Sequence, residues 1–326
     1  MQKGDQTMRT GFSIYSFWNA FRKREMTVEE AFAFMHDHGA QATEIADFSV
    51  PLHQGLPGPF RVMGYDPDME RKLVEYAEKY QVPMSAYSCG SDISRVKGDD
   101  YKRFMEHLQN EIDLAHRLGI PLIRIDLVRV MVGKDDVGIE AYDQLFEQAV
   151  ASAQTLADYA AQYGMTVTVE NHGTLMNGAD RVRKLVRAVN KPNYGVTLDL
   201  GNTVCVDEDP VFTARDLIAL AKEIHVKDFY IRNDPYAIGA KFKNGYSAPD
   251  PSVLGNGSWL TTKHLRYLRG AIVGQGDLPM RELIRTVVQS EFAGDMLIEF
   301  EGMEDPRIAC ELSLSNLRQI MELESC

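Results

Sequence analysis

The sequence predicts an α/β fold, a single closed barrel of eight parallel strands and eight helices. Short apolar runs alternate with longer amphipathic segments almost from end to end, and alternating strands and helices build parallel sheets. Eight strand–helix units can be counted, which is the number that closes a (β/α)8 barrel. A doubly wound open sheet is the weaker alternative, because no G-x-G-x-x-G pattern follows the first strand.

Eight segments have the length and composition of buried strands. In chain order they are GFSIYSF (11–17), ATEIAD (42–47), VPMSAYSC (82–89), PLIRIDLV (121–128), MTVTVE (165–170), YGVTLDL (194–200), EIHVKDF (223–229) and DMLIEFE (295–301). Short apolar runs that are rich in β-branched and aromatic residues are typical of strands in parallel sheets.

The intervening segments carry helical signals. Thr27 and Glu30 form a capping-box pattern at the start of TVEEAFAFMHDHG, and Gly39 is a suitable C-terminal stop. The connection after the seventh strand breaks the pattern, because residues 230–276 are rich in Gly, Asn, Pro and aromatic residues. Loops of this length in a compact domain are usually functional, so we expect a long loop that acts as a lid.

The chain of 326 residues is expected to form one domain, with residues 1–9 as a polar N-terminal extension, because it has no low-complexity linker. The formal net charge of −12 argues against broad contact with nucleic acid, which needs a positive field. The N-terminus lacks the apolar core of a signal peptide, and no apolar run could span a bilayer. Four scattered cysteines indicate reduced thiols, so we expect a cytoplasmic protein.

Carboxylates or an imidazole recur at the ends of four successive predicted strands. These residues are Glu170 on the fifth strand, Asp199 on the sixth, His225 on the seventh, and Glu299 and Glu301 on one face of the eighth. The carboxyl ends of the strands form the active-site rim of such barrels. Converging carboxylates would repel one another and take up protons unless a cation lay among them. The recurrence therefore predicts a metal site.

Two Glu, one Asp and one His provide mostly oxygen ligands, which suits one divalent ion, Mn²⁺, Mg²⁺, Co²⁺ or Zn²⁺, without choosing among them. Each residue also has a purely structural interpretation. Glu170 could be a salt-bridged rim acid, His225 a hydrogen-bonded core histidine, and Asp199 a helix N-cap. Recurrence at four consecutive strand ends favours the metal site over these interpretations.

Other polar residues at the predicted rim are interpreted more simply. Cys89 has no sequence partner that would make it a nucleophile, so we expect a thiol in the pocket wall. Arg124 and Asp126 are expected to form a buried ion pair inside the barrel. Tyr15, Phe17 and Trp18, near the end of the first strand, could either stack on a sugar or belong to the core.

Five motifs, in this order, resemble the sugar phosphate isomerase/epimerase family of xylose isomerase-like TIM barrels: VTVENHG, YGVTLDLGNT, EIHVKD, GQGDLP and MLIEFEG. The resemblance covers nearly the whole chain. It implies a single divalent metal ion held by Glu170, Asp199, His225 and Glu299, and it implies that Glu170 and Glu299 also move the proton. The candidates for binding the substrate are His172, Lys227, Glu44, Asn202 and Glu301.

The resemblance implies an isomerase or epimerase of a sugar, keto-polyol or related hydroxy-carbonyl compound. Its chemistry would be proton abstraction beside a carbonyl, through an enediolate that the metal ion stabilises, with a carboxylate as the base. Two bases on opposite faces give epimerisation, whereas one base serving adjacent carbons gives isomerisation. The expected partner is a small carbohydrate-like molecule, not nucleic acid or a membrane, and homo-oligomer formation is left open.

The sequence departs from the ketose 3-epimerases of this family, which argues against assigning it as a ketose 3-epimerase. Those enzymes carry a His where this chain has Asn202, and Gly-Glu beyond the seventh-strand His, where this chain has Lys227 and Asp228. One alternative is a lyase of the inosose or dehydroshikimate dehydratase type on the same metal site. An endonuclease IV-like repair enzyme is disfavoured by the acidic charge and by a total of 8 histidines, and a non-catalytic binding barrel by the four competent ligand positions.

Overall fold

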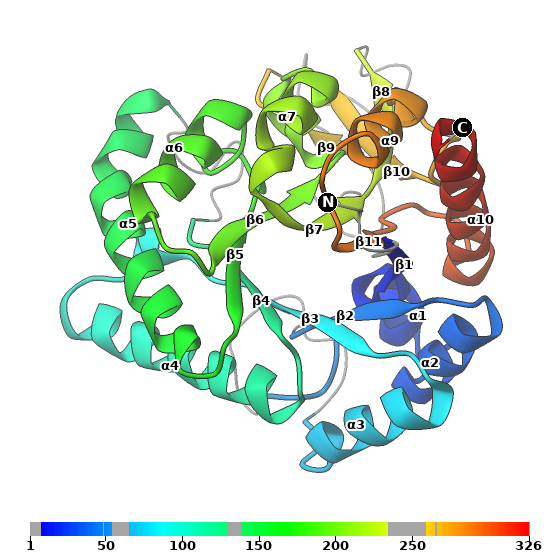
Figure 1. Cartoon of the computed structure of the whole chain (residues 1–326), viewed down its shortest axis with the longest axis horizontal. Helices are drawn as coiled ribbons and strands as arrows, with labels where there is room; N and C mark the ends of the chain where they lie inside the picture. Colours follow the sequence, from blue (N-terminus) through cyan, green and yellow to red (C-terminus); the bar gives the residue numbers. More distant parts are fainter. Residues whose placement is uncertain are drawn as a thin grey trace, which may run out of the picture.

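Eight parallel strands close into a barrel in this computed structural model, which describes residues 8–47, 49–53, 65–128, 138–233, 259–264 and 266–325. The strands follow one another around the barrel in the order β1-β11-β7-β6-β5-β4-β3-β2 (Figure 1). They are β1 (Arg9–Ser13), β2 (Ala42–Ala46), β3 (Met84–Cys89), β4 (Leu122–Ile125), β5 (Thr166–Glu170), β6 (Tyr194–Asp199), β7 (Ala221–Val226) and β11 (Asp295–Ile298). The predicted (β/α)8 barrel is confirmed.

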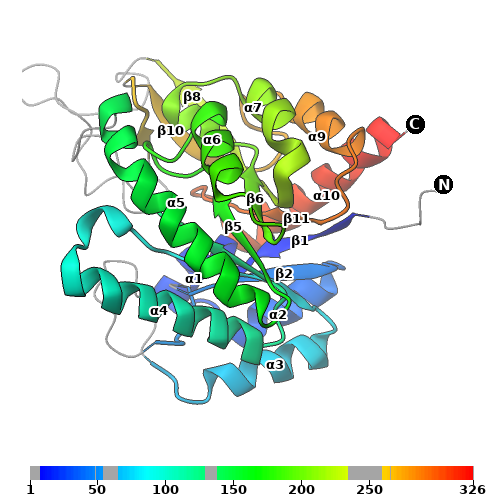
Figure 2. The ribbon, with the colours of Figure 1, turned by 60° about the vertical axis from the view of Figure 1, so that its left-hand side comes forward.

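Helices surround the barrel, and α4 and α5 lie side by side on its outside (Figure 2). The helices of the described chain are α1 (Trp18–Lys23), α2 (Val28–Asp37), α3 (Met69–Tyr80), α4 (Gly98–Arg117), α5 (Ile139–Ala161), α6 (Ala179–Val189), α7 (Pro210–Leu217), α9 (Met280–Val288) and α10 (Pro306–Ser325). The predicted capping box begins α2, since Thr27 and Glu30 each accept the other's backbone N–H. Gly39 follows this helix with a φ of +69°, which a glycine adopts without strain.

The apolar core lies between the strands and the helices, whereas the inside of the barrel is largely polar. Val169 and Leu198 are fully buried in the hydrophobic cluster that the helices complete. Side chains alternate between the two faces of a strand, so Thr168 and Thr197 point the other way, into the barrel. Their hydroxyl groups hydrogen-bond at 2.8 Å, and Thr197 also donates to Glu223 at 3.1 Å. Polar side chains therefore occupy the strand positions that face the inside of the barrel.

The long connection after the seventh barrel strand is more than the predicted loop. The segments β8 (Asp228–Arg232), β9 (Leu260–Thr261) and β10 (Tyr267–Ala271) form a three-stranded antiparallel sheet. Gly270 of β10 packs against the segment that follows β11. A Cβ atom on Gly270 would lie 2.4 Å from the carbonyl carbon of Glu301. This contact places the sheet beside the rim of the barrel. Residues 234–258 of the predicted lid lie outside the described residues.

The first strand differs from its predicted bounds, residues 11–17, at both ends. The first strand begins at Arg9, whose guanidinium binds Asp295 of β11 at 2.7 Å, so it starts where the extension predicted over about residues 1–9 was expected to end. Residues 1–7 lie outside the described residues. The same strand ends at Ser13, where a 3-10 turn over Ile14–Phe17 begins. Nowhere in the described chain does a helix combine the length and hydropathy of a membrane span.

Candidate metal and catalytic site

The four side chains predicted to hold a metal ion lie together at the carboxyl end of the barrel. Glu170 ends β5, Asp199 ends β6, His225 lies near the end of β7, and Glu299 directly follows β11. One ligand atom from each residue lies within 4.8 Å of the others, and all four residues are buried. Strand pairing places Asp199 directly opposite His225. This acid cluster, as we call the four residues, could hold one metal ion.

Asp199 shows that the acid cluster fits a cation. Its Oδ1 accepts the backbone N–H groups of Gly201 and Asn202, both at 2.7 Å. Its Oδ2 is buried and has no hydrogen-bond partner among the described residues. Burial raises the pKa of Asp199 to about 6, although the nearby Lys227 opposes the shift. The 3-10 turn over Asn202–Val206 has Gly201 as its N-cap, so the N-cap interpretation of Asp199 is wrong, although Oδ1 binds the backbone at the start of that turn. The other oxygen is available to a ligand.

His225 is oriented by carboxylates on both sides of its ring. Its Nδ1 lies 3.0 Å from Glu170 Oε1 and 3.9 Å from Glu299 Oε1, whereas its Nε2 lies 3.3 Å from Glu44 Oε1. Burial lowers the pKa of the imidazole, but the charge of Glu44 and the hydrogen bond to Glu170 outweigh it and raise that pKa well above its ordinary value. Nδ1 is therefore the nitrogen that faces the other candidate ligands.

Glu44, predicted as a substrate-binding residue, lies inside the barrel and not at its open end. It is fully buried in the middle of β2, accepts a hydrogen bond from the hydroxyl of Ser13, and faces His225. Glu223 lies beside it, with an oxygen 3.8 Å from His225 Nε2. Burial, and then Glu44, raise the pKa of Glu223 to about 8. In this arrangement Glu44 supports His225 from within the barrel.

Lys227 brings a buried ammonium group against one side of the acid cluster. Its Nζ lies 3.5 Å from Asp199 Oδ2 and 3.4 Å from Glu301 Oε1, and it pairs still more closely with Glu299. It also donates to Asn202 Oδ1 at 3.2 Å. Burial pushes the pKa of Glu299 up, but Lys227 and other cations outweigh it and lower that pKa to about 2. The predicted substrate-binding residues Lys227, Asn202 and Glu301 are thus brought together here.

Arg124 of β4 lies on the opposite side of the acid cluster. Its Nη1 is 2.9 Å from Glu170 Oε2, and its Nη2 is 3.0 Å from Asp126 Oδ2. His172, another predicted substrate-binding residue, places Nδ1 3.0 Å from the same Asp126 oxygen, and its side chain is 24% exposed. The expected ion pair between Arg124 and Asp126 is present, but the contact with Glu170 was not predicted. The alternation in RID, which turns Arg124 inward, was the signal available for it.

The aromatic residues after the first strand have separate positions. Burial, with Glu301 and Glu299 nearby, raises the pKa of Tyr15 well above its ordinary value, and its hydroxyl hydrogen-bonds Glu301. Phe17 instead packs in the core, with ring centroids 5.8 Å from Phe12. Tyr15 therefore belongs to the site, and Phe17 does not.

The cysteines of the described residues are free thiols, Cys89, Cys205 and Cys310. Cys89 is fully buried, and burial raises its pKa well above the ordinary value. A thiol in this state is a poor nucleophile, in agreement with its interpretation as part of a wall. Cys326 lies outside the described residues.

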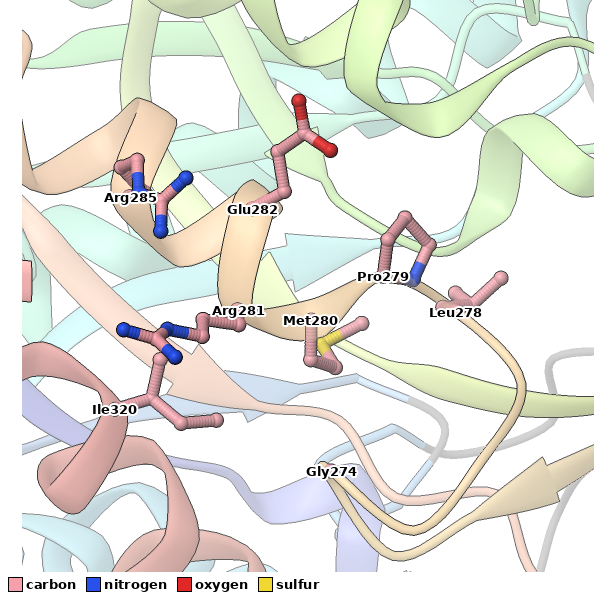
Figure 3. Close-up of a pocket in the computed structure, with 8 residues that line it drawn as sticks. All are labelled: Gly274, Leu278, Pro279, Met280, Arg281, Glu282, Arg285 and Ile320. Atoms are coloured by element: carbon pink, nitrogen blue, oxygen red, sulfur yellow. The ribbon is translucent and has the colours of Figure 1, made fainter.

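A hollow of about 430 Å³ lies away from the acid cluster, between α9 and α10 (Figure 3). Arg281 and Arg285 on its wall both bind Glu324, at 2.5 Å. The residues that line this hollow include no member of the acid cluster. The hollow is therefore not part of the candidate site.

Comparison with known proteins gives a consistent set of similarities. Residues 32–320 match the family described as xylose isomerase-like TIM barrel. The chain is 22% identical to a C-glycoside deglycosidase alpha subunit of Arthrobacter globiformis, over 90% of this chain and 83% of that protein.

Solved structures with the same fold include a magnesium complex of a xylose isomerase-like TIM barrel protein from Mycobacterium smegmatis, with 14% identity, a TM-score of 0.66 and 98% of both chains covered. A fusion of such a barrel with 4-hydroxyphenylpyruvate dioxygenase matches with 17% identity and a TM-score of 0.66, and the match covers 97% of this chain but 43% of the fusion. An L-ribulose 3-epimerase matches at 15% identity, with a TM-score of 0.65 and 98% and 99% of the two chains covered. A probable 3-DHS dehydratase from Bacillus anthracis matches at 16% identity, with a TM-score of 0.64 and 96% and 98% covered. At these identities the likeness is one of fold.

Proposed function

Because the chain belongs to the xylose isomerase-like TIM barrel family, we propose that it is a divalent-metal-dependent isomerase or epimerase of a sugar, keto-polyol or related hydroxy-carbonyl compound. The acid cluster carries this proposal, since it gathers three carboxylates and one imidazole within 4.8 Å in a buried position. The similarity in fold to a magnesium complex and to a sugar epimerase supports it. When bound, the metal ion supplies a Lewis acid for a substrate oxygen.

Glu170 and Glu299 are the proposed bases. His225 Nδ1 lies 3.0 Å from an oxygen of Glu170 and 3.9 Å from an oxygen of Glu299, so the two carboxylates flank the same point. The second oxygen of each carboxylate is held by a cation, Arg124 for Glu170 and Lys227 for Glu299. A base that is oriented in this way can remove a proton from one face of a substrate while the other base returns a proton to the opposite face.

Lys227, Asn202 and Glu301 are proposed to hold substrate oxygens on the Glu299 side. The ammonium of Lys227 already contacts the carboxylates of Glu299 and Glu301, and it donates to the amide oxygen of Asn202 at 3.2 Å. An ammonium has three donors, so it can keep a contact with Glu299 while donating to a hydroxyl or carbonyl group. A buried donor of this kind stabilises negative charge that develops on a carbonyl oxygen, because little water competes with it.

A lyase on the same site is the second candidate, and His172 favours it. An elimination needs a group that protonates the leaving oxygen or carbon, in addition to the base. His172 lies two residues beyond Glu170, is partly exposed, and is oriented by Asp126 through a 3.0 Å contact at Nδ1, which leaves Nε2 for a substrate. The similarity to a C-glycoside deglycosidase alpha subunit and to a probable dehydratase supports this candidate.

Hydrogen exchange in deuterated water tests both candidates. Ketoses, inososes and their phosphates are incubated with the metal-loaded protein, and NMR spectroscopy follows deuterium entering the carbon beside the carbonyl. We expect exchange that a chelator abolishes, and a loss of about 100-fold or more in Glu170→Gln or Glu299→Gln. The exposed Glu311→Gln is the matched control and should retain the wild-type rate.

The products separate the two candidates. An isomer or epimer with the atoms of the substrate supports the first, and a released leaving group supports the lyase. Cleavage at abasic DNA without carbon–hydrogen exchange in any of these compounds would reject both.

A further inference from the structure

Glu170 faces two groups of potential metal ligands. Its Oε1 points to His225 and the acid cluster, whereas its Oε2 points to Arg124. A second group consists of Asp126, Glu170 and His172, and their ligand atoms also lie within 4.8 Å of one another. A carboxylate shared by two such groups is typical of two-metal sites, in which the ions lie ~3.5–4 Å apart. The ligand atoms alone would therefore allow a second ion beside the first.

The guanidinium of Arg124 lies within this second group. It binds Glu170 Oε2 at 2.9 Å and Asp126 Oδ2 at 3.0 Å, and the three side chains are only 6%, 1% and 3% exposed, respectively. Arginine remains charged and presents a planar fork of donors that can bind two carboxylate oxygens at once. Its positive charge lies between Asp126 and Glu170, which are the two carboxylates that a second metal ion would otherwise neutralise.

The charges of the centre balance with one ion. The acid cluster and Asp126 contribute four carboxylates, and Lys227 and Arg124 contribute two positive charges, which leaves two negative charges, the number that one divalent ion neutralises. Glu301, which also contacts Lys227, is 23% exposed and is left out of this count because water can solvate it. A second divalent ion would add two positive charges to a buried region where no carboxylate of these groups remains unbalanced, and unpaired buried charge is costly.

We propose that Arg124 acts as a built-in cation that keeps the metal centre mononuclear by taking the place of a second divalent ion between Asp126 and Glu170. Removing this charge opens a site for a second ion with two carboxylates and the His172 imidazole as ligands. Oxygen donors with one nitrogen suit Mn²⁺, Co²⁺ or Zn²⁺. The inference rests on the proposed metal centre of the acid cluster.

Metal stoichiometry tests the inference without any substrate. The purified full chain is stripped with a chelator and titrated with Mn²⁺, bound metal per chain is measured by mass spectrometry after gel filtration, and electron paramagnetic resonance reports magnetic coupling between ions. We expect one equivalent in the wild type and two coupled equivalents in Arg124→Met. Arg124→Lys keeps the charge and is expected to bind one, and Arg124→Met/His172→Ala loses a ligand and is expected to return to one.

The outcomes separate this inference from the proposed function. A wild-type protein that binds no Mn²⁺ contradicts the metal centre itself. Two equivalents in the wild type, or one in a folded Arg124→Met, overturn the inference and leave the metal centre intact. Circular dichroism reports whether each variant is folded. Arg124→Gln, which is also uncharged but keeps a polar head group, is titrated in the same way, and we expect it to bind a second equivalent of Mn²⁺ as well.

Discussion

Replacing Lys227 with methionine removes a buried ammonium from three carboxylates and keeps most of the side-chain volume. The group lies 3.5 Å from Asp199 and 3.4 Å from Glu301, pairs most closely with Glu299, and is only 3% exposed. Removing one partner of a buried ion pair costs about 3–5 kcal/mol, because the other charge stays buried without compensation. For a chain of 326 residues, an unfolding entropy of ~2.1 cal/mol/K per residue converts this cost into a fall of ~4–7 °C in Tm.

Thermal unfolding with a chelator and with saturating Mn²⁺ measures both parts of this prediction. The metal-free Lys227→Met should unfold at the lower temperature, and Mn²⁺ should raise its Tm by more than it raises that of the wild type, because the ion then meets carboxylates that no ammonium opposes. Lys222→Met, exposed on the same strand, is the control and should behave as the wild type. Equal Tm values for the metal-free variant and wild type, or equal shifts with Mn²⁺, would refute the account of Lys227.

Three further predictions concern individual side chains. Metal content should collapse in Glu299→Ala and be largely retained in Glu301→Ala, as measured by mass spectrometry; the reverse would transfer the ligand role to Glu301. The hydrogen bonds from Arg285 and Arg281 lower the pKa of Glu324 to about 2, below the ~4.3 of a free glutamate. The ion pairs of Glu324 therefore stabilise the fold fully above pH ~4.3, and this stabilisation is lost as the pH falls towards about 2. The Tm difference between wild type and Glu324→Gln should therefore be constant from pH 7 to 5 and shrink below pH 4, and a constant difference down to pH 3 would contradict the ion pairs. Because burial raises the pKa of Cys89 well above its usual value, iodoacetamide at pH 8 should leave it unmodified in the native protein and alkylate it after denaturation, as peptide mass spectrometry would show.

The sequence predicts the barrel and the location of the acid cluster for the same physical reason. In a parallel barrel every strand delivers its carboxyl end to one rim, so Glu170, Asp199, His225 and Glu299 needed only their places on the strands to be brought together. Their distances depend on strand register, which pairs Asp199 with His225 and has no local signal in the sequence.

Contacts across the barrel could not be predicted in this way. Glu44 lies in the middle of the predicted strand 42–47 and of β2, not at the strand end, and it faces His225 inside the barrel. The contact of Arg124 with Glu170 joins the neighbouring strands β4 and β5. The alternation in RID indicates that Arg124 faces inward, but the carboxylate that it meets depends on strand register. The sheet of β8, β9 and β10 was predicted as a loop because its strands are short and lie among Gly- and Pro-rich segments.

A crystal structure of the Mn²⁺-loaded protein, with anomalous scattering measured at the manganese absorption edge, tests the central proposal most directly. The account predicts one anomalous peak per chain, coordinated by Glu170, Asp199, Glu299 and the Nδ1 atom of His225 at ~2.0–2.3 Å. A peak bound by other residues, or no peak at this end of the barrel in crystals grown with excess Mn²⁺, would contradict it.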